Sequence, residues 1–330
     1  MNLPEKFFIK TAAYRTIIND RDNDSFAHAY LLICSDETYL RAYVRAFAKA
    51  IMCEKGGLCG ECRFCKLIDK ESFCDCEFYP SEGSKPTTEG IDLIVGEKCF
   101  VKPLEAKLKM FCISGAEQMN LPSQNKLLKT LEEPPKNVII VLGATNTFTL
   151  LPTIKSRVRK LEIPAFSEEE IIDVLSPSFP DKIKLKKSAA LADGKPGEAE
   201  KIYNSFDTEK TSDECVSILK GLKKSPDIAR YSLILQKKSR DEFAAFVSSM
   251  RIVVRDLLLI KEGKKELLIN FDKEADLALL EKKYDEGALL EFCDDLDKAA
   301  NAVNNNGNQT MLADKLLFAL LEENYRWQKS

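Results

Sequence analysis

The sequence has little of several features that mark common classes of protein. Its 330 residues contain a single histidine, His28. No apolar run approaches the roughly 18 residues of a membrane span. The amino-terminal segment MNLPEKFFIKTAAYR also lacks the apolar stretch of a signal peptide. We therefore expect a cytoplasmic protein with no membrane partner.

The net charge and the single histidine also argue against two functions, direct binding of nucleic acid and catalysis by a histidine base. The net charge of −3 gives no overall attraction to nucleic acid, so contact with DNA would need a local basic surface or an assembly. His28 begins an apolar run, and no serine or cysteine pattern accompanies it. We expect a buried or interface imidazole there rather than a catalytic base.

The composition is that of a folded chain with unusually many thiols. It is 45% apolar and 31% charged, which is enough for a full core and for two or three domains. It also contains 11 cysteines, and in a reducing compartment their clustering points to metal binding rather than to disulfides.

A cysteine cluster near the amino terminus has the spacing of a metal site. Cys53, Cys59, Cys62 and Cys65 could supply four thiolates to one tetrahedral, structural zinc ion with no open coordination position. The other interpretation is a set of free buried thiols. A redox role for Cys62 and Cys65 is less expected, because no thioredoxin-type pattern surrounds them.

The stretch from Ser123 to Arg159 carries the clearest structural pattern. Leucines at helical spacing predict a helix that ends at Glu133, because Pro134-Pro135 cannot continue it. The apolar run from Val138 to Leu142 predicts a strand that is buried on both faces of a parallel sheet. The residues that follow this strand then lie where α/β proteins place groups that face a ligand.

Two segments closer to the amino terminus fit the same type of sheet. Residues 28–33 predict a buried strand, and residues 39–52 predict the helix that follows it. Strand, loop and helix in this order hold the phosphate-binding loop of P-loop proteins. A further strand is expected over residues 110–114.

The order of these segments resembles that of bacterial clamp-loader subunits of the AAA+ family. LLKTLEEPP, the strand ending in GATN, Leu151-Pro152 and Ser156-Arg157 follow one another as they do in that family. The resemblance implies an α/β fold joined to an all-α part. Residues 1–165 would form a P-loop-type parallel sheet with helices on both faces and an inserted zinc module at 53–76. Residues 166–208 would form a small helical lid, and residues 209–330 a helical collar or oligomerisation domain.

The family's first cysteine spacing is usually longer than the one in this chain. This leaves two further candidates for the fourth metal ligand, Cys74 and Cys76, which are close enough in sequence to replace Cys53.

The resemblance also predicts a degenerate nucleotide site. The family's glycine-rich loop ends in Gly-Lys-Thr, and the alignment has no gaps. Cys34, Glu37 and Tyr39 stand at the glycine positions, Leu40 at the lysine and Arg41 at the magnesium-binding Ser/Thr. These residues cannot supply the lysine or the hydroxyl that hold phosphate and magnesium, so we expect no ATP turnover in this site.

Further positions agree with that expectation. Asp36 adds negative charge where a polyphosphate would lie. Ser114 and Gly115 occupy the positions of the family's paired acidic residues, and Glu117 is too far along the chain to replace them. Gly197 stands where active subunits have a phosphate-sensing arginine.

The resemblance implies a non-hydrolysing accessory subunit in the clamp loader of the bacterial replicative DNA polymerase. It would assemble with motor and clamp-opening subunits as a hetero-oligomer that loads the sliding clamp on primed DNA. Arg157, next to Ser156, would act in trans as an arginine finger, although it could instead pair with Glu132 or Glu133. Two alternatives are an active ATPase motor subunit of the same complex and a zinc-dependent adaptor built on a decayed ATPase fold.

Overall fold

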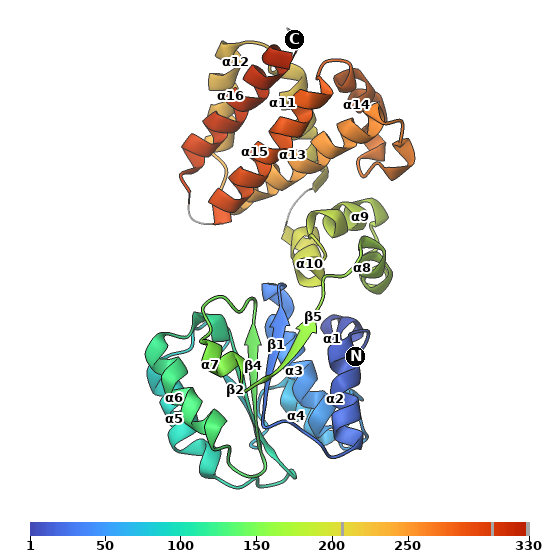
Figure 1. Ribbon diagram of the computed structural model, residues 1–330. Helices are drawn as coiled ribbons and strands as arrows, with labels where there is room; N and C mark the ends of the chain where they lie inside the picture. Colours follow the sequence, from blue (N-terminus) through green and yellow to red (C-terminus); the bar gives the residue numbers. More distant parts are fainter. Residues whose placement is uncertain (206–207, 305–306, 328–330) are drawn as a thin grey trace. The chain divides into compact units, whose positions relative to one another are not determined.

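A computed structural model describes residues 1–205, 208–304 and 307–327 of the chain (Figure 1). The chain forms two compact units. The first contains Met1–Leu175 together with Gly194–Glu198, and the second contains Ser176–Asp193 and Ala199–Ser330. The predicted lid and collar boundaries stay a prediction, and residues 206–207, beside the boundary at 208, lie outside the described residues.

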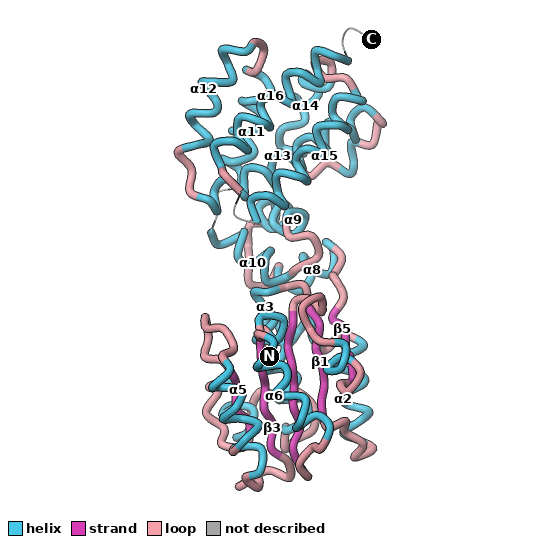
Figure 2. Tube along the Cα trace, turned by 60° about the vertical axis from the view of Figure 1, so that its left-hand side comes forward, coloured by secondary structure: helices cyan, strands magenta, loops and turns pink. Residues whose placement is uncertain are grey.

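A parallel sheet of five strands forms the centre of the first unit. Its strand order is β2-β3-β4-β1-β5, and every neighbouring pair is parallel. Figure 2 shows these strands side by side, with helices on both flanks of the sheet. The strands are β1 (Ala29–Cys34), β2 (Cys76–Tyr79), β3 (Lys109–Ser114), β4 (Val138–Ala144) and β5 (Arg159–Ile163).

The helices of the first unit cover both faces of this sheet. Leu31 points to the face that packs against Leu127, whereas the neighbouring Tyr30 packs its ring on Phe47 of the opposite layer, as alternation along a strand requires. One layer contains α5 (Thr88–Gly96) and α6 (Leu121–Glu132). The other contains α1 (Leu3–Phe8), α2 (Ala12–Asp22), α3 (Glu37–Met52) and α4 (Arg63–Asp69).

The remaining elements of the first unit are short. They are η1 (Lys98–Phe100), η2 (Ala116–Gln118), α7 (Pro152–Lys155) and α8 (Glu168–Leu175). The parallel sheet with helices on both faces confirms the predicted fold of this part of the chain. The predicted helix over 39–52 begins two residues earlier, at Glu37, because Asp36 caps it.

The central strand β4 lies close to helix α3 because it contains a glycine. A Cβ atom added at Gly143 would lie 2.6 Å from Cγ2 of Val44 in α3. Real Cβ atoms do not approach a neighbour so closely, so only glycine allows this helix to pack so near the sheet. Gly143 pairs with Leu32 of β1, and the two central strands therefore share this packing.

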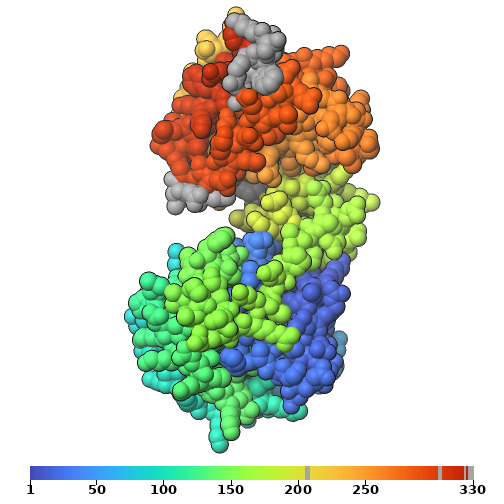
Figure 3. Space-filling model, viewed as in Figure 1, coloured from blue at the N-terminus to red at the C-terminus, as the bar shows by residue number. Residues whose placement is uncertain are grey.

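The second unit is helical in the described part of the chain. The apolar residues of α13 (Arg240–Lys261) from Phe243 to Leu257 lie in a buried core together with Leu289, Phe292 and Leu296 of α15 (Glu286–Asn304). Figure 3 shows the face of this unit mainly in orange and red, the colours of its carboxyl-terminal residues. The helices are α9 (Lys182–Leu191), α10 (Pro196–Ser205), which begins in the first unit, α11 (Thr208–Gly221), α12 (Ser225–Gln236), α13 (Arg240–Lys261), η3 (Lys265–Leu267), η4 (Phe271–Lys273), α14 (Glu274–Glu281), α15 (Glu286–Asn304) and α16 (Gln309–Trp327).

Within the described residues, no helix combines the length and the apolar character needed to cross a bilayer.

Candidate metal centre and candidate nucleotide-site region

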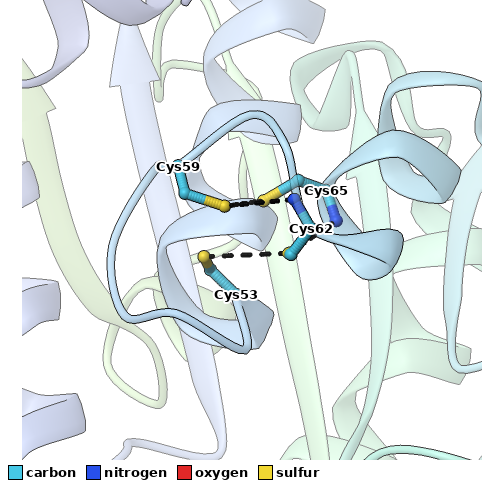
Figure 4. A group of neighbouring side chains, drawn as sticks. All are labelled: Cys53, Cys59, Cys62 and Cys65. Atoms are coloured by element: carbon cyan, nitrogen blue, oxygen red, sulfur yellow. Dashed lines mark hydrogen bonds between the residues drawn. The ribbon is translucent and has the colours of Figure 1, made fainter.

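Four thiols from the segment between α3 and α4 converge on one point (Figure 4). The sulfur atoms of Cys53, Cys59, Cys62 and Cys65 all lie within 4.8 Å of one another. The Cys53–Cys62 sulfur distance is 3.9 Å, and the Cys59–Cys65 distance is 3.8 Å. These distances are far too long for disulfides. They match the roughly 3.8 Å between sulfurs that a tetrahedral zinc site with bonds of about 2.3 Å requires.

The local backbone explains how this short segment gathers the thiols. Cys53 is the C-cap of α3, and Cys62 is the N-cap of α4, with its sulfur accepting a hydrogen bond from the N–H of Cys65. Gly56 and Gly57 adopt positive φ angles of 80° and 76°, which allow the chain to turn between the two helices.

Backbone donors also favour a thiolate at one of these positions. The N–H groups of Cys62 and Glu61 point at the sulfur of Cys59, at 3.3 and 3.4 Å, and lower the pKa of that thiol to about 6. Burial acts in the opposite direction on Cys53 and Cys65 and raises their pKa values. A cation at the centre would favour the thiolate form of all four.

The two other candidate ligands lie elsewhere. Cys74 is exposed, and its sulfur lies 3.8 Å from the carboxylate of Glu105. Cys76 is buried in β2 and is not among the residues that form the cluster. The four-thiol group therefore contains Cys53, and it fits a metal ion. The identity of that ion as zinc stays a prediction.

The loop between β1 and α3 is closed by an internal carboxylate. Asp36 is only 3% exposed. Its side chain accepts hydrogen bonds from the N–H of Tyr39, at 3.2 Å, and from the N–H of Gly197, at 2.6 Å. Burial is the main cause that raises the pKa of Asp36 above its usual range. This carboxylate lies at the amino-terminal end of α3, where backbone N–H groups attract anions.

The residues at the predicted phosphate-loop positions have structural contacts of their own. Cys34 is buried, which raises the pKa of its thiol to about 12, and Glu37 is exposed. Tyr39 and Leu40 are buried, and the ring of Tyr39 packs against Phe7 and Tyr43. Arg41 donates to the carboxylate of Glu71 at 2.8 Å and to the carbonyl of Pro80 at 2.7 Å.

The carboxyl ends of β3 and β4 are linked by Glu117. Its carboxylate accepts hydrogen bonds from the N–H and the hydroxyl of Thr145, at 3.3 and 3.0 Å. The hydroxyl of Ser114 is buried and has no hydrogen-bond partner among the described residues. Gly115 has a φ angle of 72° and leads the chain into the short helix that carries Glu117.

The predicted arginine finger lies on the surface of the first unit. Arg157 is 35% exposed and forms an ion pair with Glu132 at 2.9 Å. Its guanidinium also donates to the carbonyl of Thr153 at 3.0 Å, and Ser156 donates its hydroxyl to the same carbonyl. The side chain is thus held on the surface by contacts that a neighbouring molecule could replace.

Sequence reasoning missed the contact between Asp36 and Gly197. An aspartate before a periodic apolar segment is a recognisable helix cap, so the role of Asp36 at α3 had a usable signal. No local signal points to its second partner, which lies 161 residues away.

The five parallel strands in the order β2-β3-β4-β1-β5, with the strand–loop–helix unit formed by β1 and α3, agree with the P-loop-type sheet predicted for this part of the chain. Residues 9–167 match the family described as "DNA polymerase III, delta subunit". This part of the chain belongs to the clamp-loader branch of the AAA+ family.

Individual proteins are also similar to parts of this chain. The chain is 29% identical over 205 residues to DNA polymerase III subunit delta' of Pseudomonas aeruginosa, which covers 60% of this chain and 61% of the relative. It is 32% identical over 164 residues to subunit delta' of Bacillus subtilis, covering 49% of each. It is also similar to a solved structure, a DNA polymerase III gamma subunit-related protein of Thermotoga maritima. The identity is 18%, the TM-score 0.48, and the coverage 94% of this chain and 99% of that one.

The chain therefore spans about half to three-fifths of the length of these curated delta' relatives. The names of these relatives state what those proteins are. For this chain, the activity and the partners are proposed below.

Proposed function

We propose that this chain is a clamp-loader subunit of delta-prime type that does not hydrolyse ATP. It assembles with motor and clamp-opening subunits of the replicative DNA polymerase and helps them to load the sliding clamp on primed DNA. In this assembly Arg157 acts in trans on the ATP bound by a neighbouring motor subunit.

The buried carboxylate of Asp36 is the observation that carries the proposal. A nucleotide phosphate at the amino-terminal end of α3 would meet this charge, which already accepts the N–H groups of Tyr39 and Gly197. Leu40, at the lysine position, is buried and cannot neutralise phosphate. Arg41, at the magnesium-binding position, is engaged with Glu71. The lost ligands and the added charge both disfavour ATP.

The surface contacts of Arg157 support the second part of the proposal. A guanidinium that is one-third exposed and paired with a surface carboxylate can exchange partners at little cost, because exposed ion pairs contribute only about 0–1 kcal/mol. A planar guanidinium is suited to stabilise the charge that develops on a transferring phosphoryl group.

The four-cysteine group supports a structural metal in this proposal. The sulfur atoms of Cys53, Cys59, Cys62 and Cys65 would fill all four coordination positions of a tetrahedral ion, so no position would remain for a substrate or a reactive water. The metal would hold the loop between α3 and α4, which has few apolar residues of its own.

Equilibrium binding and turnover test the proposal together. The isolated chain should show neither ATP hydrolysis nor saturable binding of a fluorescent ATP analogue, and it should co-purify with the other clamp-loader subunits. If the isolated chain hydrolyses ATP and a substitution at Asp36 changes the rate, the chain is an active motor subunit. If the chain binds zinc but does not co-purify with the clamp-loader subunits, the zinc-dependent adaptor is favoured.

A further inference from the structure

One carboxylate caps two helices that are far apart in the sequence. Oδ1 of Asp36 accepts the N–H of Tyr39 in the first turn of α3, and Oδ2 accepts the N–H of Gly197 in the first turn of α10. First-turn N–H groups have no partner inside their own helix, so each needs an acceptor from outside. Asp36 therefore satisfies an otherwise unpaired donor in each of two helices.

The segment that carries Gly197 is pressed against the core at both of its glycines. A Cβ added at Gly197 would lie 2.5 Å from the ring of Tyr39 and 2.8 Å from Oδ1 of Asp36. A Cβ added at Gly194 would lie 2.6 Å from the Cβ of Ala165. The carbonyl of Gly194 also accepts the N–H of Phe166 at 2.9 Å. Residues 194–198 thus belong to the first unit, although their chain neighbours do not.

The surroundings keep water away from this contact. Asp36 is 3% exposed, and the ring of Tyr39, 4% exposed, lies directly beside it. The charges of Lys195 and Glu198 act on the carboxylate in opposite directions. A hydrogen bond to a charged acceptor in such a site is stronger than one at the surface.

The amino-terminal end of a helix is a common binding site for phosphate, and here one carboxylate accepts from two such ends. We propose that Asp36 is a tethered substitute for such an anion, which holds residues 194–198 on the core in every nucleotide condition. This inference concerns the attachment of that segment, and it goes beyond the absence of hydrolysis proposed above.

The variant Asp36→Asn separates the two contacts of this side chain. Asparagine caps helices as well as aspartate does, so α3 should keep its cap and the fold should remain. Its side chain has only one oxygen, however, and its NH₂ group must then face one of the two N–H donors. The bond to Gly197 should therefore weaken while the molecule remains folded.

Hydrogen exchange of the Gly197 amide in the full chain reads this bond directly. The wild-type amide should exchange slowly and at the same rate with and without Mg·ATP. In Asp36→Asn its protection should fall about 10- to 100-fold, the range expected for a lost hydrogen bond to a charged group. Gly197→Ala changes the donor residue of the same hydrogen bond, and protection of the amide at position 197 should fall by a similar factor.

A matched control is Asp181→Asn, at the N-cap of α9, where the carboxylate accepts the N–H of Lys184 at 3.0 Å on the surface. This variant should leave the exchange of residues 194–198 unchanged. Equal protection in wild type and Asp36→Asn would overturn the proposal. So would a wild-type amide that becomes further protected when Mg·ATP is added.

Discussion

The ammonium group of Lys49 in α3 is paired with the carboxylate of Glu5 in α1, and both side chains are almost completely buried. The same ammonium contacts both carboxylate oxygens of Asp69 in α4 at 2.8 Å. The Lys49 ammonium group therefore joins three helices, and α4 is the helix that is capped by Cys62 and contains Cys65 of the candidate metal centre.

Replacement of Lys49 should destabilise the first unit severely. Lys49→Met would leave the Glu5 carboxylate buried without its cation, and breaking a buried pair in this way costs about 3–5 kcal/mol. Urea unfolding measures the loss. The matched control is Lys55→Met, which removes an exposed pair with Glu61 and should leave the unfolding midpoint unchanged. A midpoint in Lys49→Met equal to that of the control would contradict the role given to this pair.

The contact between β4 and α3 predicts the effect of adding one methyl group. Gly143→Ala would bring a Cβ within 2.6 Å of Val44 and should cost about 1–3 kcal/mol, the usual range for overpacking. In Gly96→Ala the added Cβ meets no atom within 4 Å, so this variant should be as stable as wild type or slightly more stable. The thermal unfolding midpoint should therefore fall in Gly143→Ala and should not fall in Gly96→Ala.

The cysteine cluster predicts which single substitutions release a metal. Cys62→Ser and Cys53→Ser should each lose bound zinc in elemental analysis, because a tetrahedral site needs all four thiolates. Far-UV circular dichroism should stay close to that of wild type, since the sheet does not depend on this loop. The control is Cys74→Ser, at an exposed thiol outside the cluster, and it should retain zinc. Loss of zinc in Cys74→Ser but not in Cys53→Ser would show that the ligand set is wrong.

Arg157 and Glu132 separate a function in trans from a structural ion pair. In a reconstituted clamp loader, Arg157→Ala should reduce DNA-dependent ATP turnover by about tenfold or more, with unchanged zinc content and thermal unfolding. We expect less than the 10³- to 10⁵-fold of the GTPase fingers, because the neighbouring site supplies most of its own groups. Glu132→Ala removes the same ion pair but leaves the guanidinium in place, so turnover should be maintained. If both variants slow the assembly equally, the pair is structural.

Burial of Asp36 predicts a specific dependence of stability on pH. Because burial raises the pKa of this carboxyl, the folded chain binds a proton at a pH where the unfolded chain has already released it. The contribution of Asp36 to the free energy of unfolding therefore falls as pH rises from about 4 through its raised pKa, by at most about 1.4 kcal/mol per pH unit. It should then become constant. The difference in unfolding free energy between wild type and Asp36→Asn, measured from about pH 4 to pH 8, should show this slope, and a flat difference would contradict it.

The sequence predicted the central elements of the first unit because their patterns are local. The apolar run at 138–142 lies inside β4, and the helix expected to end at Glu133 ends at Glu132, with Glu133 as the C-cap before the two prolines. The sequence spacing of Cys53, Cys59, Cys62 and Cys65 was also enough to predict that their thiols form one group.

The contacts that the sequence could not supply are those between distant segments. The sequence predicts that Asp36 disfavours phosphate, but its bond to Gly197 depends on how the chain returns to the core after α9. In sequence, Gly197 stands at the position of a lost arginine, whereas in the structure this position has no room even for a methyl group. Such steric limits follow from the packing of residues that no local pattern connects.

The Asp36 carboxylate is covalently part of the chain, so its local concentration does not depend on the concentration of any free anion. The carboxylate of Asp36 has an effective local concentration set by the geometry of the α3 turn, and no dilution or change in the cellular ratio of ATP to ADP can alter it. A free anion could bind there only by displacing the Asp36 carboxylate, which is attached to the chain. The attachment of residues 194–198 is consequently insensitive to the energy supply of the cell.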